Sequence, residues 1–261
     1  MVDVSFSLFT VEYFILILVR VTGLISTAPF FNTRNTPARV RVALGAFIAL
    51  LLMETVNGQG TYTYSGSIGY GILVLQEGIT GMFIGLAANI CNSIILFAGN
   101  MIDTHLGLSM ATEYDPQNGA QVTLNSSFYN YLFMMLLIIS DMHQYIIRAL
   151  ADTYTLIPIG GATFGNESLY TGVVTFCLEF FSIAFRITLP VFSCIMILNC
   201  VLGIMAKVAP QMNMFAVGIQ IKIISGYAIL FVTVAILPRM ANLIFDEMKT
   251  MMVRIIESMM R

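Results

Sequence analysis

The sequence predicts an all-α integral membrane protein. Only 10% of its 261 residues are charged and 58% are hydrophobic, whereas soluble domains carry about 25% charged residues. Mean hydropathy is +0.87. Residues 78–102, 116–140 and 187–206 contain no charge at all, and a run of about 20 apolar residues can cross a bilayer as a helix. These runs are continuous, whereas barrel strands alternate over about ten residues, so helices are expected.

About six hydrophobic segments are expected, separated by turn-forming residues such as Pro37 and the Gly160–Gly161 pair. Residues 1–240 are expected to form the membrane domain and 241–261 an amphipathic C-terminal helix. The six segments cover roughly residues 4–30, 40–56, 68–100, 127–150, 169–206 and 214–237.

The distribution of basic residues conflicts with six regular crossings. Arg34, Arg39 and Arg41 crowd one short connection, which should therefore face the cytoplasm. Six crossings would then place the basic C-terminal tail outside. The third and fifth segments are too long for one upright span, so we expect bent or re-entrant hairpins rather than a regular bundle. Such shapes persist at membrane depth only where protein covers them or they line water.

The third segment carries a stripe of small and polar residues on one helical face. Three explanations are open: packing within this chain, contact with another subunit, or, for Glu77 and Asn92, the wall of a wet channel. The stripe consists of Glu77, Gly81, Gly85, Ala88, Asn92, Gly99 and Asp103.

Ionisable residues inside apolar segments are expensive and are functional candidates by default. They would suit a proton relay in a transporter, or structural pairing. The candidates are Glu77, Asp141, His143, Glu179, Arg186, Lys207 and Lys222.

Residues 107–121, GLSMATEYDPQNGAQ, interrupt two strongly apolar segments. Asp115-Pro116 and Asn118-Gly119 are turn signals, and Gly107 adds backbone freedom. The stretch is either a plain surface loop or a loop that folds back into a pore.

The tail from Leu243 to Met260 places apolar side chains on one face, which suits the membrane interface or, because methionine is flexible, contact with partner proteins. That face consists of Ile244, Met248, Met251, Met252, Ile255 and Met259. The four cysteines lie in apolar runs and are expected to be buried free thiols.

Several function classes lack support. The two histidines and four cysteines show no metal-ligand spacing, and no phosphate-binding glycine motif occurs. Neither a metal nor a cofactor is expected, and the net charge of −2 gives no basic surface for nucleic acid. The chain does not look like an enzyme.

Four stretches together resemble the FliR family of flagellar type III export-gate proteins. The most specific is Ala209-Pro210-Gln211-Met212-Asn213 with Phe215 and, downstream, Lys222. The others are Arg20, Gly23, Pro29, Phe30, Pro37 and Arg41; the glycine-rich residues 77–85; and residues 99–117 with Asp141, His143, Ile157, Pro158 and Gly160.

The resemblance implies a subunit that joins FliP-like and FliQ-like subunits, and an FlhB-like subunit, in a channel for unfolded flagellar proteins. It places the chain in the bacterial inner membrane, at the flagellar basal body, in contact with lipid. An ion-coupled small-solute transporter and an assembly scaffold without a pore role remain the alternatives.

The resemblance also implies two groups of site residues. The first is a pore plug that includes Gly107, Met110, Glu113, Asp115, Pro116, Gln117 and Gly119. The second is a set of intramembrane polar or interface residues: Glu77, Gly81, Gly85, Asn92, Asp141, His143, Arg186, Lys207, Pro210, Gln211, Asn213 and Lys222.

Overall fold

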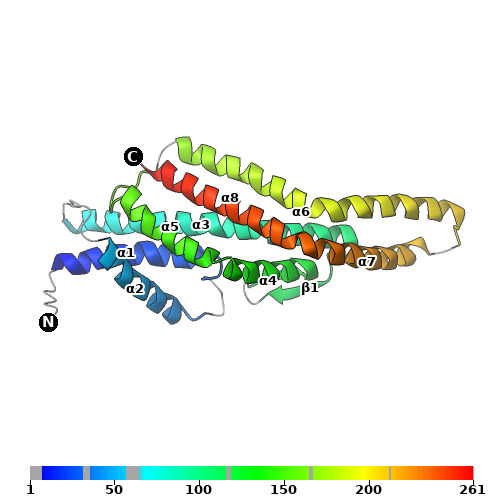
Figure 1. Ribbon diagram of the computed structural model, residues 1–261, viewed down its shortest axis with the longest axis horizontal. Helices are drawn as coiled ribbons and strands as arrows, with labels where there is room; N and C mark the ends of the chain where they lie inside the picture. The colour runs from blue at the N-terminus through cyan, green and yellow to red at the C-terminus, as the bar shows by residue number, and fades with distance from the viewer. Residues whose placement is uncertain are drawn as a thin grey trace. The chain divides into compact units, whose positions relative to one another are not determined.

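The structure is a computed structural model that describes residues 8–31, 36–56, 64, 66–115, 119–164, 167–211 and 213–260. Nearly all of the described chain is helical, so the predicted all-α fold class is confirmed (Figure 1). In chain order the elements are α1 (Leu8–Thr27), α2 (Ala38–Thr55), α3 (Gly66–Leu106), β1 (Thr112–Asp115), β2 (Ala120–Thr123), α4 (Leu124–Ile139), α5 (Met142–Leu156), α6 (Glu167–Val208), α7 (Met214–Thr233), the 3-10 turn η1 (Val234–Ile236) and α8 (Leu237–Met259).

Four stretches of described helix are long and apolar enough to cross a membrane: Thr10–Thr27, Gly66–Leu106, Tyr170–Val208 and Ala216–Met259. A fifth is obtained if α4 and α5, separated by a short break, count as one span. The predicted segment at 40–56 forms α2, but Arg39, Arg41 and Glu54 make it too highly charged to qualify. About six apolar segments therefore correspond to four or five candidate spans.

The chain forms two compact units, and α3, α6 and α8 each contribute residues to both. The first unit consists of Met1–Ile90, Asp141–Phe176 and Glu247–Arg261, and the second of Cys91–Ser140 and Cys177–Asp246.

In the first unit, α1 and α3 pack closely because two glycines of α3 lack side chains at the contact. A Cβ atom on Gly81 would overlap the backbone carbonyl of Arg20, and one on Gly85 would lie 2.6 Å from the carbonyl oxygen of Leu24. Gly81 and Gly85 of the stripe therefore serve helix packing within this chain. This is one of the three explanations that the sequence left open.

The apolar face of α8 is also covered by the chain. Met248, Met251, Met252 and Met259 are all buried, and the Met259 carbonyl accepts a hydrogen bond from the backbone N–H of Thr163 at 3.0 Å. The prediction that this face lies in the membrane interface or meets partner proteins is therefore wrong. Burying the methionines against the rest of the unit removes the apolar area that would otherwise bind lipid.

The second unit contains a β-hairpin within residues 107–121 and the two residues that follow, where a loop was expected. β1 and β2 pair antiparallel, with Thr112 opposite Thr123 and Asp115 opposite Ala120. Gly119 adopts a φ of 66° beside the turn, and its N–H donates to the Asp115 carbonyl at 2.8 Å. Pairing satisfies backbone groups that a loop between two apolar helices would leave to water. Pro116, Gln117 and Asn118 lie outside the described residues.

Three of the four cysteines are not buried as predicted. Cys91 is buried in α3, but Cys177, Cys194 and Cys200 are exposed on α6. Only 17% of the most apolar stretch of α6 is buried, against 56% in α3. In a membrane helix an apolar position can face lipid or another subunit, so hydrophobicity alone does not predict burial within the chain.

The close approach of α1 to α3 predicts that Gly81→Ala will be strongly destabilising. The new methyl group would overlap a backbone carbonyl that cannot move without shifting α1, and overpacking of this kind costs about 1–3 kcal/mol or more. Gly71→Ala on the same helix is the matched control, because nothing lies within 4 Å of its Cβ position. Thermal unfolding in detergent measures both variants. Equal melting temperatures would contradict the proposed α1–α3 contact.

Candidate functional site

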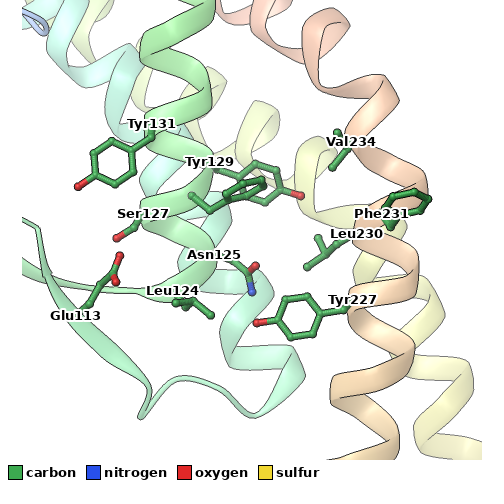
Figure 2. A pocket seen from close by; sticks show the side chains of 11 residues that line it. Glu113, Leu124, Asn125, Ser127, Tyr129, Tyr131, Tyr227, Leu230, Phe231 and Val234 are labelled. Carbon is green, nitrogen blue, oxygen red and sulfur yellow. The ribbon is translucent and has the colours of Figure 1, made fainter.

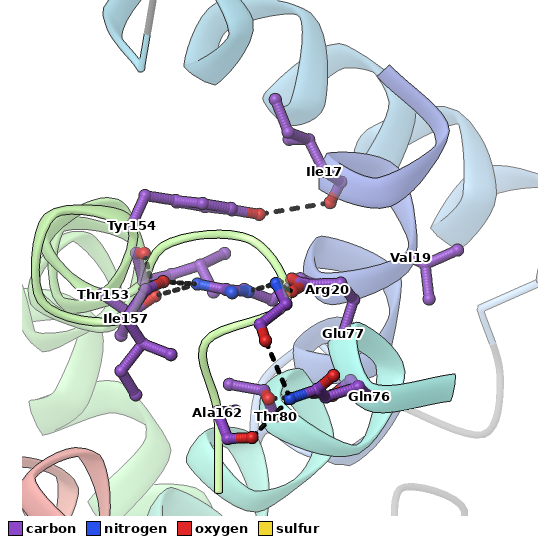
Figure 3. A network of polar contacts seen from close by, with 12 residues as sticks. Ile17, Val19, Arg20, Gln76, Glu77, Thr80, Thr153, Tyr154, Ile157 and Ala162 are labelled. Atoms are coloured by element: carbon purple, nitrogen blue, oxygen red, sulfur yellow. Dashed lines mark hydrogen bonds and ion pairs between the residues drawn. The ribbon is translucent and has the colours of Figure 1, made fainter. Parts of the chain in front are cut away.

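In the first unit, a completely buried ion pair joins α1 and α3. Arg20 Nε lies 2.6 Å from Glu77 Oε2, and both side chains are completely buried. Figure 3 shows the pair at the centre of a wider network of polar contacts. A buried charge is costly unless it is paired and hydrogen-bonded. Among the described residues, Arg20 Nη2 has no hydrogen-bond partner, whereas Nε and Nη1 both have one.

The guanidinium of Arg20 also reaches α5. Its Nη1 donates to Thr153 Oγ1 at 3.3 Å and to the Ile157 carbonyl at 3.2 Å. Its carbon lies 4.2 Å from the centroid of the Tyr154 ring, a distance at which a cation is attracted to the ring face. Tyr154 in turn donates its hydroxyl to the Ile17 carbonyl of α1 at 3.3 Å. Arg20 therefore fastens the C-terminal end of α5 to α1.

Glu77 holds the segment that follows α5. Its Oε1 accepts the backbone N–H of Gly160 at 3.0 Å, and the neighbouring Gln76 amide donates to the carbonyls of Gly160 and Ala162. Gly160 has a φ of 77°, which favours glycine. One ion pair thus connects α1, α3, α5 and residues 157–162. Glu77 faces Arg20 inside this unit and is inaccessible to water.

The second candidate region is the base of the β-hairpin in the second unit. Asp103, at the end of α3, accepts hydrogen bonds from the backbone N–H of Asn125 at 2.9 Å and from its side-chain amide. Thr123 donates to Asn100 Oδ1 at 2.8 Å. A Cβ on Gly99 would overlap Ser126, so α3 and α4 are in close contact here. The hairpin is therefore held rigidly at its base.

The outer part of the hairpin is exposed. Met110, in the connection that leads into the hairpin, is 96% exposed, and Glu113 and Tyr114 of β1 also face outward. Asp115 is instead buried and accepts a hydrogen bond from the Tyr131 hydroxyl of α4 at 3.4 Å. Gly107 precedes the hairpin with a φ of 81°, where α3 ends. Of the described residues predicted to form a plug, Glu113, Asp115 and Gly119 lie in the hairpin, and Gly107 and Met110 lie in the connection that leads from α3 into it.

The remaining predicted polar residues are not gathered into one site. Asn92 is 2% exposed, and its Oδ1 has no hydrogen-bond partner within the described ranges. Asp141 is exposed at the break between α4 and α5 with a φ of 55°, and His143 lies half-buried beside Phe30, with ring centroids 6.0 Å apart. Lys222 is half-buried on α7. Besides Asp141, the exposed ones are Arg186, Lys207, Pro210, Gln211 and Asn213.

Sequence reasoning missed most of the ion-pair network. Arg20 is the one basic residue in the first 33 residues, which is a usable signal. Thr153, Tyr154 and Gln76 carry no such signal, because their roles follow only from the packing of α5 against α1 and α3.

Tyr64, a described residue outside the candidate spans, is a titratable group whose pKa is perturbed. Tyr64 donates its hydroxyl to Glu12 Oε2 at 2.8 Å. This hydrogen bond to a carboxylate raises the pKa of Tyr64 above its ordinary value. The contact links Tyr64, two positions before the start of α3, to α1.

Comparison with known proteins shows the family of this chain. The family model for bacterial export proteins, family 1, matches residues 11–248. The chain belongs to this family. The match includes the ion-pair residues and the whole hairpin.

Similar proteins of this family are flagellar biosynthetic proteins FliR. The FliR protein of Pectobacterium carotovorum is 30% identical over 230 residues, which are 88% of this chain and 87% of that protein. FliR of Bacillus subtilis is 27% identical over 86% of both chains. FliR of Escherichia coli K12 is 24% identical over 93% of this chain and 92% of its own. The predicted resemblance to the FliR family is confirmed.

The geometry predicts that Arg20→Met will destabilise this export-family protein severely, because it leaves the Glu77 carboxylate buried without its counter-ion. Breaking a buried pair costs about 3–5 kcal/mol. The double variant Arg20→Met/Glu77→Gln should recover more than half of that loss, because a neutral amide oxygen still accepts the Gly160 N–H. Thermal unfolding of the purified protein measures both.

Arg148→Met on the exposed face of α5 is the control, and it should change the free energy of unfolding by no more than about 0.5 kcal/mol. If the double variant is no more stable than Arg20→Met, the two side chains do not act as a pair.

Proposed function

We propose that this chain is a membrane subunit of the flagellar protein export apparatus, located in the inner membrane. It joins FliP-like, FliQ-like and FlhB-like subunits and helps to form the channel through which unfolded flagellar proteins leave the cell. The observation that carries the proposal is the match to a bacterial export family over 238 of 261 residues. The similar proteins, which this chain matches along most of their length, are flagellar biosynthetic proteins.

The exposed helices support an assembly of several subunits. α6 and α7 leave most of their apolar side chains uncovered; Ile197, Val208 and Phe231 are 67%, 78% and 83% exposed. The same helices carry Arg186 and Lys222, which lipid alone would solvate poorly. Partner helices with acceptor groups would cover both the apolar area and the charges.

The buried ion pair removes Glu77 as a relay group in the alternative of an ion-coupled small-solute transporter. A relay group must exchange protons with water, whereas Glu77 and Arg20 are inaccessible and bonded to each other. In our proposal they instead fix the helix arrangement that partner subunits recognise.

The proposal predicts that the chain is stable only with partners. Coexpressed with FliP-like and FliQ-like chains, it should purify with them as one large complex in mild detergent, since the polar groups of α6 and α7 then find partners. Expressed alone, it should aggregate or be degraded. Size-exclusion chromatography combined with mass spectrometry identifies the companions. A monodisperse, long-lived monomer would overturn the proposal.

We further propose that the hairpin region acts as a plug that restricts the resting channel. A channel wide enough for a polypeptide would leak ions unless something occupied it. The hairpin is held at its base by Asp103 and Asn100 and exposes its outer part, so it can project from a fixed position.

Replacing residues 110–119 with a shorter Gly/Ser linker removes β1 and should raise ion permeability. The measurement is halide or dye influx in cells that express the whole export complex. Complex assembly, measured by co-purification of the partner subunits, is the control. An assembled variant with unchanged permeability would mean that the channel is sealed elsewhere.

A further inference from the structure

The hairpin of the second unit is fixed at its base. A Cβ on Gly226 of α7 would overlap the side chain of Leu106, which is completely buried, so α7 packs directly against the last residue of α3. The backbone N–H of Leu108 donates to the Asp103 carbonyl at 2.8 Å, and Thr123, the last residue of β2, is bonded to α3. Because both ends of the hairpin are held, any movement must take place in its outer part.

The outer part of the hairpin is held on α4 through Asp115, the last residue of β1. The other three residues of this strand are exposed, whereas Asp115 is only 1% exposed. Its carboxylate accepts a hydrogen bond from the Tyr131 hydroxyl at 3.4 Å. Figure 2 shows Tyr131 projecting from α4 on the side where Glu113 of β1 lies. Tyr131 follows Leu124, the first residue of α4, by about two helical turns, so this contact lies well away from the base of the hairpin.

The hydrogen bond between Asp115 and Tyr131 is long. Hydroxyl donors usually lie about 2.5–3.0 Å from their acceptors, and Tyr131 is 47% exposed, so water can compete for its hydroxyl. Asp115 gives up hydration when it is buried, and burying a carboxylate is costly. Release of the contact returns this carboxylate to water. The outer part is therefore held by a small difference in free energy, which suits a part that has to move.

Space for such a movement is available beside the hairpin. A cavity of about 510 Å³ lies among β1, α4 and α7, with Glu113, Phe128 and Phe231 in its lining (Figure 2). Phe128 and Phe231 are themselves 50% and 83% exposed. The outer part of the hairpin can therefore shift on this side without displacing side chains of the buried core.

We propose that the contact between Asp115 and Tyr131 is a latch that keeps the outer part of the hairpin in its resting position on α4. Opening breaks this hydrogen bond while the base of the hairpin stays in place. An exported chain that enters the channel then has to overcome a weak polar contact rather than the packing of a helix. This inference rests on the plug role proposed for the hairpin, and it names the contact that regulates the plug.

The first test measures hydrogen exchange of the β1 and β2 amides in the full chain, purified with its partner subunits. Tyr131→Phe keeps the ring and removes the donor, so exchange should become about threefold to tenfold faster, as expected for the loss of one hydrogen bond. Tyr170→Phe makes the same change at a 71% exposed position of α6 and should leave the exchange unchanged. Equal exchange in Tyr131→Phe and Tyr170→Phe would overturn the inference.

A second comparison shows whether the hydroxyl acts through Asp115. In an Asp115→Ala background the acceptor is missing, so adding Tyr131→Phe should have no further effect on the exchange of the hairpin amides. If Tyr131→Phe accelerates exchange equally in both backgrounds, its hydroxyl acts on another group and the latch is refuted. Should Asp115→Ala fail to assemble, the comparison of Tyr131→Phe with Tyr170→Phe still decides.

Ion influx in cells that express the whole export complex separates the latch from the plug. Tyr131→Phe should raise the resting influx, though less than replacement of residues 110–119 by the Gly/Ser linker. If the replacement raises influx and Tyr131→Phe does not, the plug role stands and the latch is overturned. If neither raises influx, the plug role itself fails, and the exchange measurements alone decide whether this contact holds the hairpin.

Discussion

The Arg20–Glu77 ion pair is the interaction on which the first unit depends. Neither charge could remain in an apolar interior alone, because desolvation costs several kcal/mol per ion. Each therefore requires the other, and together they require the donors and acceptors that surround them. Because those atoms belong to α1, α3, α5 and residues 157–162, the pair specifies which segments must meet.

The glycines of α3 make that meeting possible. Gly81 and Gly85 allow the backbones of α1 and α3 to approach closely. This close approach lets Arg20 Nε come within 2.6 Å of Glu77 Oε2. Close backbone approach through small residues is a common means of helix association where the surroundings are as apolar as the helices. Packing and electrostatics are thus two aspects of one contact: small residues bring the helices together, and the ion pair selects their register.

In the second unit, the structural requirement concerns the connection between α3 and α4. α3 ends at Leu106 and α4 begins at Leu124. The connection between these two apolar helices must satisfy its backbone hydrogen-bonding groups without help from lipid. Strand pairing within the hairpin and the bonds of Asp103 and Thr123 achieve this. The resulting element is rigid at its base and exposed at its outer part. This combination suits a part that projects from the membrane helices.

Composition and periodicity alone predict the membrane helices, their apolar segments and the small-residue face of α3, because these depend on hydrophobicity and on the helical repeat. The motifs around Arg20, Gly81 and Pro210 predict the family. Sequence could not indicate that Arg20 and Glu77, 57 positions apart, share a hydrogen bond, that the methionines of α8 are buried, or that residues 112–123 pair as strands. Nor could it show which cysteines of apolar helices face outward. Apolar residues are equally favourable against lipid, a partner or the same chain, so only the tertiary structure decided where each one lies.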